Sequence, residues 1–467
     1  MKHLTINALF IGVSDISVRL FSFIAVTYLA RALGPANIGA LAIGMAILTY
    51  ATVISNMGLP MLGVRSVAAK TDSIQNLVKR ICSAQLLFSI ITFSIGAGIL
   101  FLYIEEWSIR IVAIIYLSTL FPSALMLEWL FQGLNKMKIL SIGQIFGMAV
   151  YLLFVIGLVS NAADIYWVPF AWCFGLLIKT IYFWTRYKKL NSRGNVNKQP
   201  LHLLGIIKQG IPLGIASLIS QVVIQFPFIY LGCFDTTENT GLYSVAFRVV
   251  VLMLVIDRVF YTLFFPAVSR SFKDSIENLK ERVNWTLKIV TGGSLYIAML
   301  AFIAGRDLLP VIFGSEFRDS GLIFQALLGY FVLTIINSVF TFTLIGIKKE
   351  RLYTKSLLIG AIAFVTILFL PLPLPATLMA PIALAIQQIV SMLMMMKYLR
   401  QSILTNLFPR VFLALSVTII FVIFVILWQH LYPLLVSIIA AVFALPIITV
   451  ASGINRRDLI ILKGFIN

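Results

Sequence analysis

The sequence predicts an all-α polytopic membrane protein with about 14 transmembrane helices. Of the 467 residues, 60% are hydrophobic and only 11% are charged, and the mean hydropathy is +1.02. A soluble domain carries about 25% charged residues. The apolar residues fall into stretches of about 20, the length that a helix needs to cross a bilayer core. Internal repetition then divides the helices into two parallel-repeat six-helix lobes and a C-terminal helix pair.

Clusters of charge, Pro and Gly separate the expected spans. Their limits are 9–30, 38–60, 81–103, 111–131, 139–159, 165–185, 210–232, 242–265, 287–305, 322–345, 355–370, 376–396, 410–428 and 432–452. The eleventh span ends at the run PLPLP (371–375), because proline cannot continue a helix. All intervening loops are short, so none can house a catalytic domain, and we expect no enzyme.

The few charges are unevenly distributed, with 36 Lys and Arg against 17 Asp and Glu and a net charge of +19. If the chain starts in the cytoplasm, an even number of spans places 28 of the 36 basic residues on the cytoplasmic side. This asymmetry is typical of membrane proteins, whose cytoplasmic loops retain Lys and Arg. It predicts a multi-pass membrane protein with both termini in the cytoplasm. Nucleic-acid binding is not expected.

The three cysteines, Cys82, Cys173 and Cys233, lie in apolar surroundings without paired spacing or histidine partners. Neither a metal site nor a disulfide framework is expected from such a pattern. The sequence also has no glycine-rich phosphate-binding loop. We therefore expect no cofactor, and H⁺ or Na⁺ as the counter-ion if transport is driven by a gradient.

The two halves of the chain share short sequence echoes. YLAR…NIGAL at 28–41 aligns with YLGC…NTGLY at 230–243 at an offset of 202 residues. FQGLNK at 131–136 then aligns with LIGIKK at 344–349. The repeat unit is six spans, which is an even number, so both copies enter the membrane in the same direction. The expected domains are 1–200 (N-terminal lobe and cytoplasmic linker), 201–400 (C-terminal lobe) and 401–467 (the additional helix pair and tail).

Several motifs together resemble a known family. They are YLARALGPANIG at 28–39, MGLP at 57–60 with Arg65, WLFQGLNKMK at 129–138 and KQGIPL at 208–213. In these segments the chain resembles the Wzx-type O-antigen or polysaccharide-repeat flippases of the multidrug/oligosaccharidyl-lipid/polysaccharide (MOP) exporter superfamily. The resemblance covers roughly residues 5 to 400. Such proteins usually have twelve core spans, and related lipid flippases carry an additional pair.

The resemblance implies a function and a location, the bacterial cytoplasmic (inner) membrane. A Wzx-type flippase translocates an undecaprenyl-diphosphate-linked oligosaccharide from the inner to the outer leaflet by alternating access. The partners implied are this lipid-linked glycan, membrane lipid, a polysaccharide polymerase and a chain-length regulator. A lipid II-type flippase of the same superfamily remains an alternative substrate class.

Charges within the spans are the candidate functional residues, because a charge at mid-bilayer costs about 2.5–3.5 kcal/mol and normally faces a partner or a wet cavity. Asp15 and Arg19 lie four residues apart on the first span and can pair on one helical face. Two interpretations remain open: an ion pair that only orients the helix, or a cavity-facing pair. In the second, the Arg19 guanidinium would bind substrate phosphate, which its fork geometry suits.

Further charged and polar residues complete the predicted cleft. The cations are Arg19, Arg31, Arg248, Arg258 and Lys179, and the carboxylates, which are also the candidate ion-coupling sites, are Asp15, Glu128 and Asp257. Arg31 can equally be an interface anchor, Arg248 can snorkel, and interhelical pairing can explain Glu128 and Lys179. At the 202-residue offset Ser55 and Asn56 correspond to Asp257 and Arg258, and Gln221 corresponds to Arg19.

The excess of cations over carboxylates in the predicted cleft helps to distinguish between the possible functions. A cationic cleft suits a diphosphate and repels organic cations. A MATE-type drug or cation exporter would instead need more carboxylates than cations in its cleft. A membrane polymerase or ligase would need a sizeable outer loop with catalytic groups, and the longest outer loop, 306–321, has no histidine.

Overall fold

The computed structural model describes residues 2–70, 73–191 and 203–400, together with four isolated positions between 416 and 452. All the regular elements within these residues are helices. Contacts divide the chain into two compact units, Met1–Ser244 and Val245–Asn467. The predicted lobe boundary near residue 200 is placed from the sequence repeat, whereas these units are defined by contacts. The predicted boundary therefore stays a prediction. The expected spans 410–428 and 432–452 lie outside the described residues.

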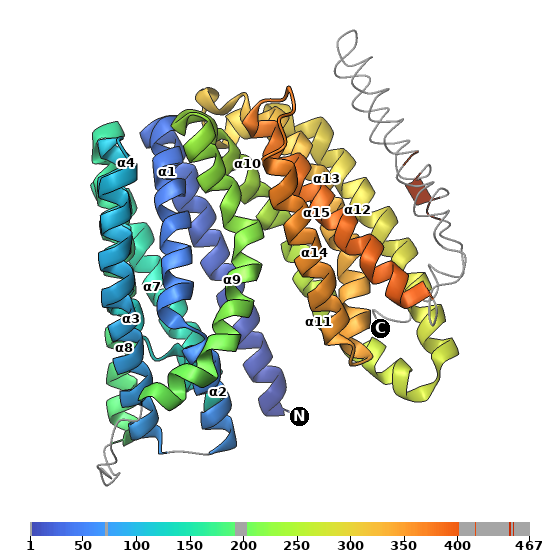
Figure 1. The fold of residues 1–467 in the computed structure, drawn as a ribbon, viewed down its shortest axis with the longest axis horizontal. Coiled ribbons are helices and arrows are strands. Elements are labelled where there is room, and N and C mark those ends of the chain that lie inside the picture. The colour runs from blue at the N-terminus through green and yellow to red at the C-terminus, as the bar shows by residue number, and fades with distance from the viewer. Residues whose placement is uncertain are drawn as a thin grey trace. The chain divides into compact units, whose positions relative to one another are not determined.

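Ten helices of the first unit and the start of an eleventh account for spans one to seven (Figure 1). They are α1 (Lys2–Asn56), α2 (Leu59–Ala69), α3 (Ile74–Tyr103), α4 (Trp107–Ser118), α5 (Leu120–Ala124), α6 (Glu128–Gly133), α7 (Met137–Leu158), the 3₁₀ helix η1 (Ala162–Tyr166), α8 (Trp167–Asn191), α9 (Leu203–Phe234) and the start of α10 (Thr237–Met253). Helix α1 contacts α3, α4, α7 and α9. The first unit is therefore a bundle assembled around α1.

The second unit accounts for spans eight to twelve. Its helices are the end of α10, α11 (Val255–Asp274), α12 (Ile276–Phe313), the 3₁₀ helix η2 (Ser315–Phe317), α13 (Ser320–Gly346), α14 (Glu350–Leu368) and α15 (Ala376–Arg400). Helix α13 packs against α11, α12 and α15, and α15 also packs against α14. The proline run at 371–375 separates α14 from α15, as predicted.

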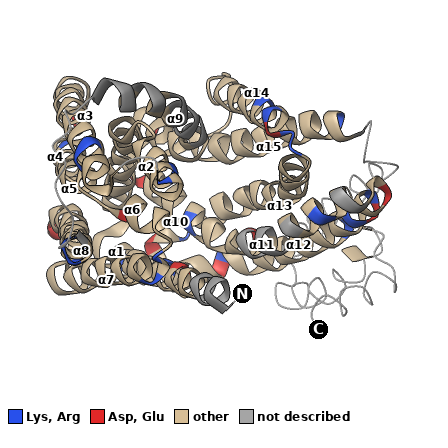
Figure 2. Cartoon of the chain, turned by 90° about the horizontal axis from the view of Figure 1, so that it is seen from below, with Lys and Arg blue, Asp and Glu red and all other residues tan. Residues whose placement is uncertain are grey.

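Helices thus occupy all twelve predicted spans that fall within the described ranges. By length and composition, 10 helices within the described residues could cross a membrane. One of these, Phe10–Asn56, is 47 residues long and contains the first two predicted spans. Most helical positions carry none of the four charged residue types (Figure 2). The chain is a multi-pass membrane protein.

A kink replaces the loop that we expected between the first two spans. Within α1 only Gly34 has a non-helical backbone, with φ 76° and ψ 173°, and Pro35 follows it. A positive φ is accessible to glycine at little cost because it lacks a Cβ. Proline cannot donate to the preceding turn, so the helix axis changes direction here. One glycine is therefore sufficient to separate two spans.

The sequence echo at the ends of α6 and α13 is also a structural repeat. Asn135 after α6 and Lys348 after α13 both adopt a left-handed backbone, with φ 55° and 61°. In both turns the next residue donates its N–H to the carbonyl oxygen five positions back. This bond closes the helix C-terminus in the Schellman manner. The same turn at two positions 213 residues apart agrees with a duplicated six-span unit.

The two copies of the first sequence echo, at 28–41 and 230–243, contact each other. A Cβ added to Gly39 would overlap the carbonyl oxygen of Thr237, and one added to Gly241 would overlap the carbonyl oxygen of Pro35. Both residues of one close approach lie 202 positions from their counterparts in the other. The contact is therefore pseudo-symmetric, and glycine is required on both sides because only it permits such an approach.

Candidate functional site

Short hydrogen bonds and small residues hold α7 between α1 and α8. The Ser141 hydroxyl donates to the carbonyl of Phe10 (2.9 Å), and the Ser14 hydroxyl donates to Oε1 of Gln144 (3.1 Å). On the other side of α7, Gly147 approaches the backbone of Gly175 on α8. These contacts fix the three helices that surround a cavity.

We call this space, of about 220 Å³, the charged cavity. It is lined by Asp15 and Val18 of α1, by Gln144, Gly147, Met148 and Tyr151 of α7, and by Trp172, Gly175, Leu176 and Lys179 of α8. An anionic and a cationic side chain thus line one space between apolar helices. Burial of charge at such a position is costly unless the charge is paired or wet.

Both lining charges have partners. Arg19 Nε donates to Asp15 Oδ2 at 3.3 Å, which confirms the predicted pairing along the helix. Lys179 forms an ion pair with Glu128 of α6, which confirms the interhelical alternative for these two residues. Four of the predicted charged residues therefore gather at one cavity as two ion pairs.

Aromatic packing places Glu128 within reach of Lys179. Trp129 and Phe131 of α6 are buried in a core cluster with Phe183 of α8. The rings of Phe131 and Phe183 have centroids 5.4 Å apart. Because α6 is held against α8 by these rings, Glu128 at the start of α6 faces the part of α8 that carries Lys179. The contribution of each pair to substrate or ion binding stays a prediction.

The other predicted residues of the first unit lie outside the charged cavity lining. Arg31 is exposed, three residues before the kink at Gly34. Ser55 is buried and donates to the carbonyl of its own helix at Thr52 (3.1 Å). Asn56 accepts a hydrogen bond from Gln85 of α3 at 2.6 Å. Gln221 is half-buried on α9.

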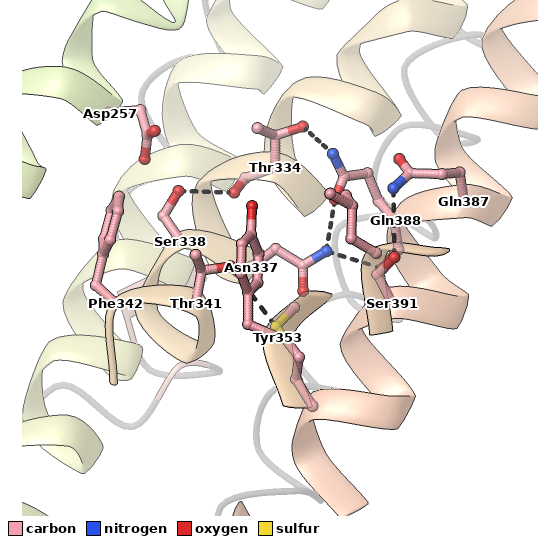
Figure 3. A pocket seen from close by; sticks show the side chains of 12 residues that line it. Asp257, Thr334, Asn337, Ser338, Thr341, Phe342, Tyr353, Gln387, Gln388 and Ser391 are labelled. Atoms are coloured by element: carbon pink, nitrogen blue, oxygen red, sulfur yellow. Dashed lines mark hydrogen bonds between the residues drawn. The ribbon is translucent and has the colours of Figure 1, made fainter. Parts of the chain in front are cut away.

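Three predicted residues belong to the second unit. Arg248 is half-buried on α10, and Asp257 lies in the first turn of α11. The side chain of Arg258 lies outside the described residues. Asp257 lines a second cavity, of about 250 Å³, which we call the amide cavity (Figure 3). Its other walls come from α13, α14 and α15.

Sequence reasoning missed most of the amide cavity. Its lining residues are Asp257, Thr334, Asn337, Ser338, Thr341, Phe342, Tyr353, Leu357, Gln387, Gln388, Ser391 and Met395. The sequence does contain a signal for this cavity. Four of the five lining residues of α13 are polar and recur at 334, 337, 338 and 341. This spacing places them on one helical face. It also missed Gln144, Tyr151 and Trp172 of the charged cavity, which are uncharged.

Among the described residues, no group of three or more His, Cys, Asp or Glu side chains could hold a metal ion. The predicted roles of Asp15, Glu128 and Asp257 with H⁺ or Na⁺ stay predictions.

Fold and site together define a helical multi-pass membrane protein with a duplicated six-span unit and polar cavities inside its helical bundles. The chain belongs to the polysaccharide biosynthesis protein family, whose model matches residues 4–272.

The similar proteins agree with this assignment. The chain is 24% identical over 353 residues to a "Putative O-antigen transporter" of Shigella dysenteriae, covering 73% of this chain and 86% of that protein. Its fold is similar to that of the lipid II flippase MurJ in an inward closed conformation, with a TM-score of 0.73, 13% identity and coverage of 97% of this chain and 100% of that one.

A second fold relative is an inward-facing MATE multidrug resistance transporter of the MOP superfamily. Its TM-score is 0.64 at 13% identity, with 82% of this chain and 95% of that one covered. The predicted MurJ/MATE-like fold is therefore confirmed. These relatives carry transporter or flippase names, in agreement with the prediction that the chain is not an enzyme.

Proposed function

We propose that the chain is a flippase for an undecaprenyl-diphosphate-linked oligosaccharide, the O-antigen or a related polysaccharide repeat unit, and that it works by alternating access. The observation that carries the proposal is the charged cavity, in which Lys179 lines a space beside the Asp15–Arg19 pair within a polysaccharide biosynthesis protein. Lysine and arginine are the side chains that bind phosphate, lysine as a point charge and arginine through its fork.

In each ion pair, a carboxylate would occupy the N–H donors of the cation until the substrate phosphate arrives. Arg19 and Lys179 are balanced by Asp15 and Glu128, so they do not leave an isolated charge in the membrane. A diphosphate entering the cavity would compete with these carboxylates for the same N–H donors. The cations would be hydrogen-bonded both before and after the substrate arrives, and the displaced carboxylates of Asp15 and Glu128 would then have to be balanced by H⁺ or Na⁺.

We also propose that an H⁺ or Na⁺ gradient drives transport, with Asp257 as the favoured ion-coupling residue. Asp15 and Glu128 form ion pairs within the first unit, whereas the Oδ1 atom of Asp257 is buried without a hydrogen-bond partner among the described residues. A buried carboxylate oxygen of this kind gains most from binding a cation or a proton.

In the cell, we place the protein in the bacterial inner membrane with both termini in the cytoplasm. A polysaccharide polymerase and a chain-length regulator would act on the translocated product. The family, the O-antigen name of the Shigella relative and the positive-inside pattern of the loops support this assignment.

Complementation tests the proposed function. The gene is expressed in a strain that lacks its O-unit flippase, and lipid-linked intermediates in each leaflet are analysed by mass. We expect the chain to restore surface polysaccharide and to clear the intermediate that accumulates in the inner leaflet. Clearance of lipid II instead would favour the lipid II-type alternative, and export of organic cations without either effect would refute the proposal in favour of a drug exporter.

Cysteine labelling tests the orientation. Cys233 is exposed near the end of α9, on the side that we expect to face outward. A membrane-impermeant maleimide should label wild-type cells at Cys233 and should not label Cys233→Ser. In the Cys233→Ser background, Asn195→Cys should react only after the membrane is permeabilised. Labelling of Asn195→Cys in intact cells would reverse the topology.

A further inference from the structure

The amide cavity of the second unit is polar, and the described residues that line it include no Lys or Arg. Its lining includes one carboxylate, Asp257, and otherwise amides, hydroxyls, two aromatic rings and aliphatic side chains. Without Lys or Arg in the lining, it is unsuited to a diphosphate. Its chemistry therefore belongs to a different part of a substrate.

A chain of hydrogen bonds fixes the orientation of one wall. Nδ2 of Asn337 donates to the backbone carbonyl of Gln388 at 2.8 Å and also to Oε1 of the Gln388 side chain. Nε2 of Gln388 then donates to Oγ1 of Thr334 at 2.9 Å, and the Thr334 hydroxyl donates to the carbonyl of Tyr330 at 2.7 Å. A backbone carbonyl can only accept, so the amide nitrogen of Asn337 must face Gln388.

The neighbouring amide is oriented in the same way. Nε2 of Gln387 donates to Oγ of Ser391 at 3.3 Å, and the Ser391 hydroxyl donates to the carbonyl of Ser356 at 3.2 Å. The serine proton is committed to a carbonyl, so the serine oxygen is the acceptor for Gln387. The donors named in these two chains are thus used within the protein.

Two amide oxygens of these side chains accept no hydrogen bond within the described residues. Oδ1 of Asn337 and Oε1 of Gln387 have no hydrogen-bond partner among the described residues, and the two side chains belong to residues only 5% and 2% exposed. A buried polar atom without a partner destabilises the protein. Both atoms belong to residues that line the cavity, and this combination favours a ligand that donates hydrogen bonds.

The spacing of these acceptors favours a polyhydroxyl compound over a metal ion. Hard cations need several oxygen ligands that converge to about 2.0–2.6 Å. In Figure 3, Asp257 and Gln387 lie on opposite sides of the cavity, with Asn337 between them. The amide oxygens of Asn337 and Gln387 can each accept a hydrogen bond from a different hydroxyl of one ring.

Size and shape agree with a single ring. A cavity of about 250 Å³ is smaller than the roughly 300–1,000 Å³ of sites for drug-sized ligands. Tyr353 and Phe342 add aromatic faces to the polar wall. Such faces suit the C–H surface of a sugar ring, while the tyrosine hydroxyl keeps a polar contact.

We propose that the amide cavity is a saccharide subsite that binds one neutral sugar ring of the transported glycan. The ring would donate hydroxyl protons to the amide oxygens of Asn337 and Gln387. This inference rests on the proposed flippase function, and it assigns recognition of the neutral glycan to residues that contact no phosphate.

The test measures sugar binding directly on the purified full chain in lipid nanodiscs. Saturation-transfer NMR is recorded with the methyl glycosides of glucose, galactose, rhamnose and N-acetylglucosamine. We expect at least one of them to receive magnetisation from the wild-type protein. Leu357→Phe fills the cavity without altering a hydrogen bond and should reduce that signal at least fivefold. Leu358→Phe is the matched control, because Leu358 is the next residue of α14 and is not among the lining residues; its signal should be unchanged.

Two further variants separate a sugar from a cation. Gln387→Met removes the free amide oxygen at similar volume and should also weaken the sugar signal at least fivefold. Asp257→Asn removes the one charge among the described lining residues and should leave the sugar signal within twofold. Equal signals for wild type and Leu357→Phe, or no signal from any glycoside, would overturn the subsite. Broadening of the ²³Na resonance that requires both Asp257 and an unfilled cavity, without sugar binding, would overturn it in favour of a cation site.

Failure of this inference is distinguishable from failure of the proposed function. A chain that complements the flippase-deficient strain but gives no sugar signal remains a flippase without this subsite. A chain that binds a glycoside through the amide cavity but does not complement loses the proposed function instead.

Discussion

The charged cavity and the amide cavity occupy comparable places in the two units but have opposite chemistry. The first is built largely from α7 and α8, which are spans five and six, and the second largely from α13, α14 and α15, which include spans eleven and twelve. Ion pairs dominate the first, whereas amides and hydroxyls dominate the second. The six-span repeat has therefore kept its helix architecture while the cavity walls have diverged.

The divergence has a physical consequence. A charge inside a membrane must be balanced, so each cation of the charged cavity is accompanied by a carboxylate. The amides of the amide cavity are neutral and need no counter-charge, and Asp257 is the one charge among its described lining residues. In the functions that we propose, one unit would recognise an anion and the other a neutral group.

Removal of Arg19 should have the largest effect, because it tests whether the charged cavity handles phosphate at all. We expect Arg19→Ala to abolish surface polysaccharide while membrane insertion remains intact, as measured by glycan staining and by immunoblot of the membrane fraction. The loss of a charged hydrogen bond of about 1.5–3 kcal/mol corresponds to roughly 10–100-fold weaker binding of the phosphate. Lys138→Ala is the control, because Lys138 is an exposed cation at the start of α7 that neither lines the cavity nor belongs to the predicted cleft. Full display in Arg19→Ala would remove the phosphate function from this cavity.

Sequence reasoning and structure agree where the interactions are local. The hydropathy of single spans predicted the helices, the four-residue spacing predicted the Asp15–Arg19 pair, and the proline run predicted the end of α14. Each of these depends on residues within one or two turns of each other. The twelve spans that fall in the described ranges were therefore readable from the sequence alone.

The cavities were less predictable because they depend on contacts between distant helices. Asn337 and Gln388 meet only when α13 and α15 pack in a particular register. In a membrane the lipid-facing and buried sides of a helix are both apolar, so hydropathy says little about which faces meet. The kink at Gly34 was missed for a related reason, since a loop and a single left-handed glycine have the same sequence signature.

Substitution of the paired glycines should have the second largest effect and tests what the two copies of the repeat have kept in common. Gly39→Val and Gly241→Val each place a side chain against a backbone carbonyl that cannot move without shifting a helix. Because the contact is pseudo-symmetric, we expect both variants to reduce complementation strongly and to a similar degree. Gly98→Val is the control, since no atom lies within 4 Å of an added Cβ there. A severe effect at one glycine with none at the other would show that the repeat is not functionally symmetric at this contact.

The smallest effect is expected at the Lys179–Glu128 pair, and it tests whether the charge of the first cavity must be balanced. The two side chains are 18% and 32% exposed, so we expect removal of either charge to cost about 1–3 kcal/mol, less than for a fully buried pair. Lys179→Met and Glu128→Gln should each lower the thermal unfolding midpoint in nanodiscs by several degrees, because each leaves its partner unbalanced. The double variant should recover most of the loss in the thermal unfolding midpoint, since it leaves no unpaired charge. It should still transport less than wild type, because the proposed contact of the lysine with phosphate is lost. Additive losses of stability in the double variant would mean that Lys179 and Glu128 act independently. The contrast between a charge-balanced first cavity and an amide-lined second cavity would then rest on Asp15 and Arg19 alone.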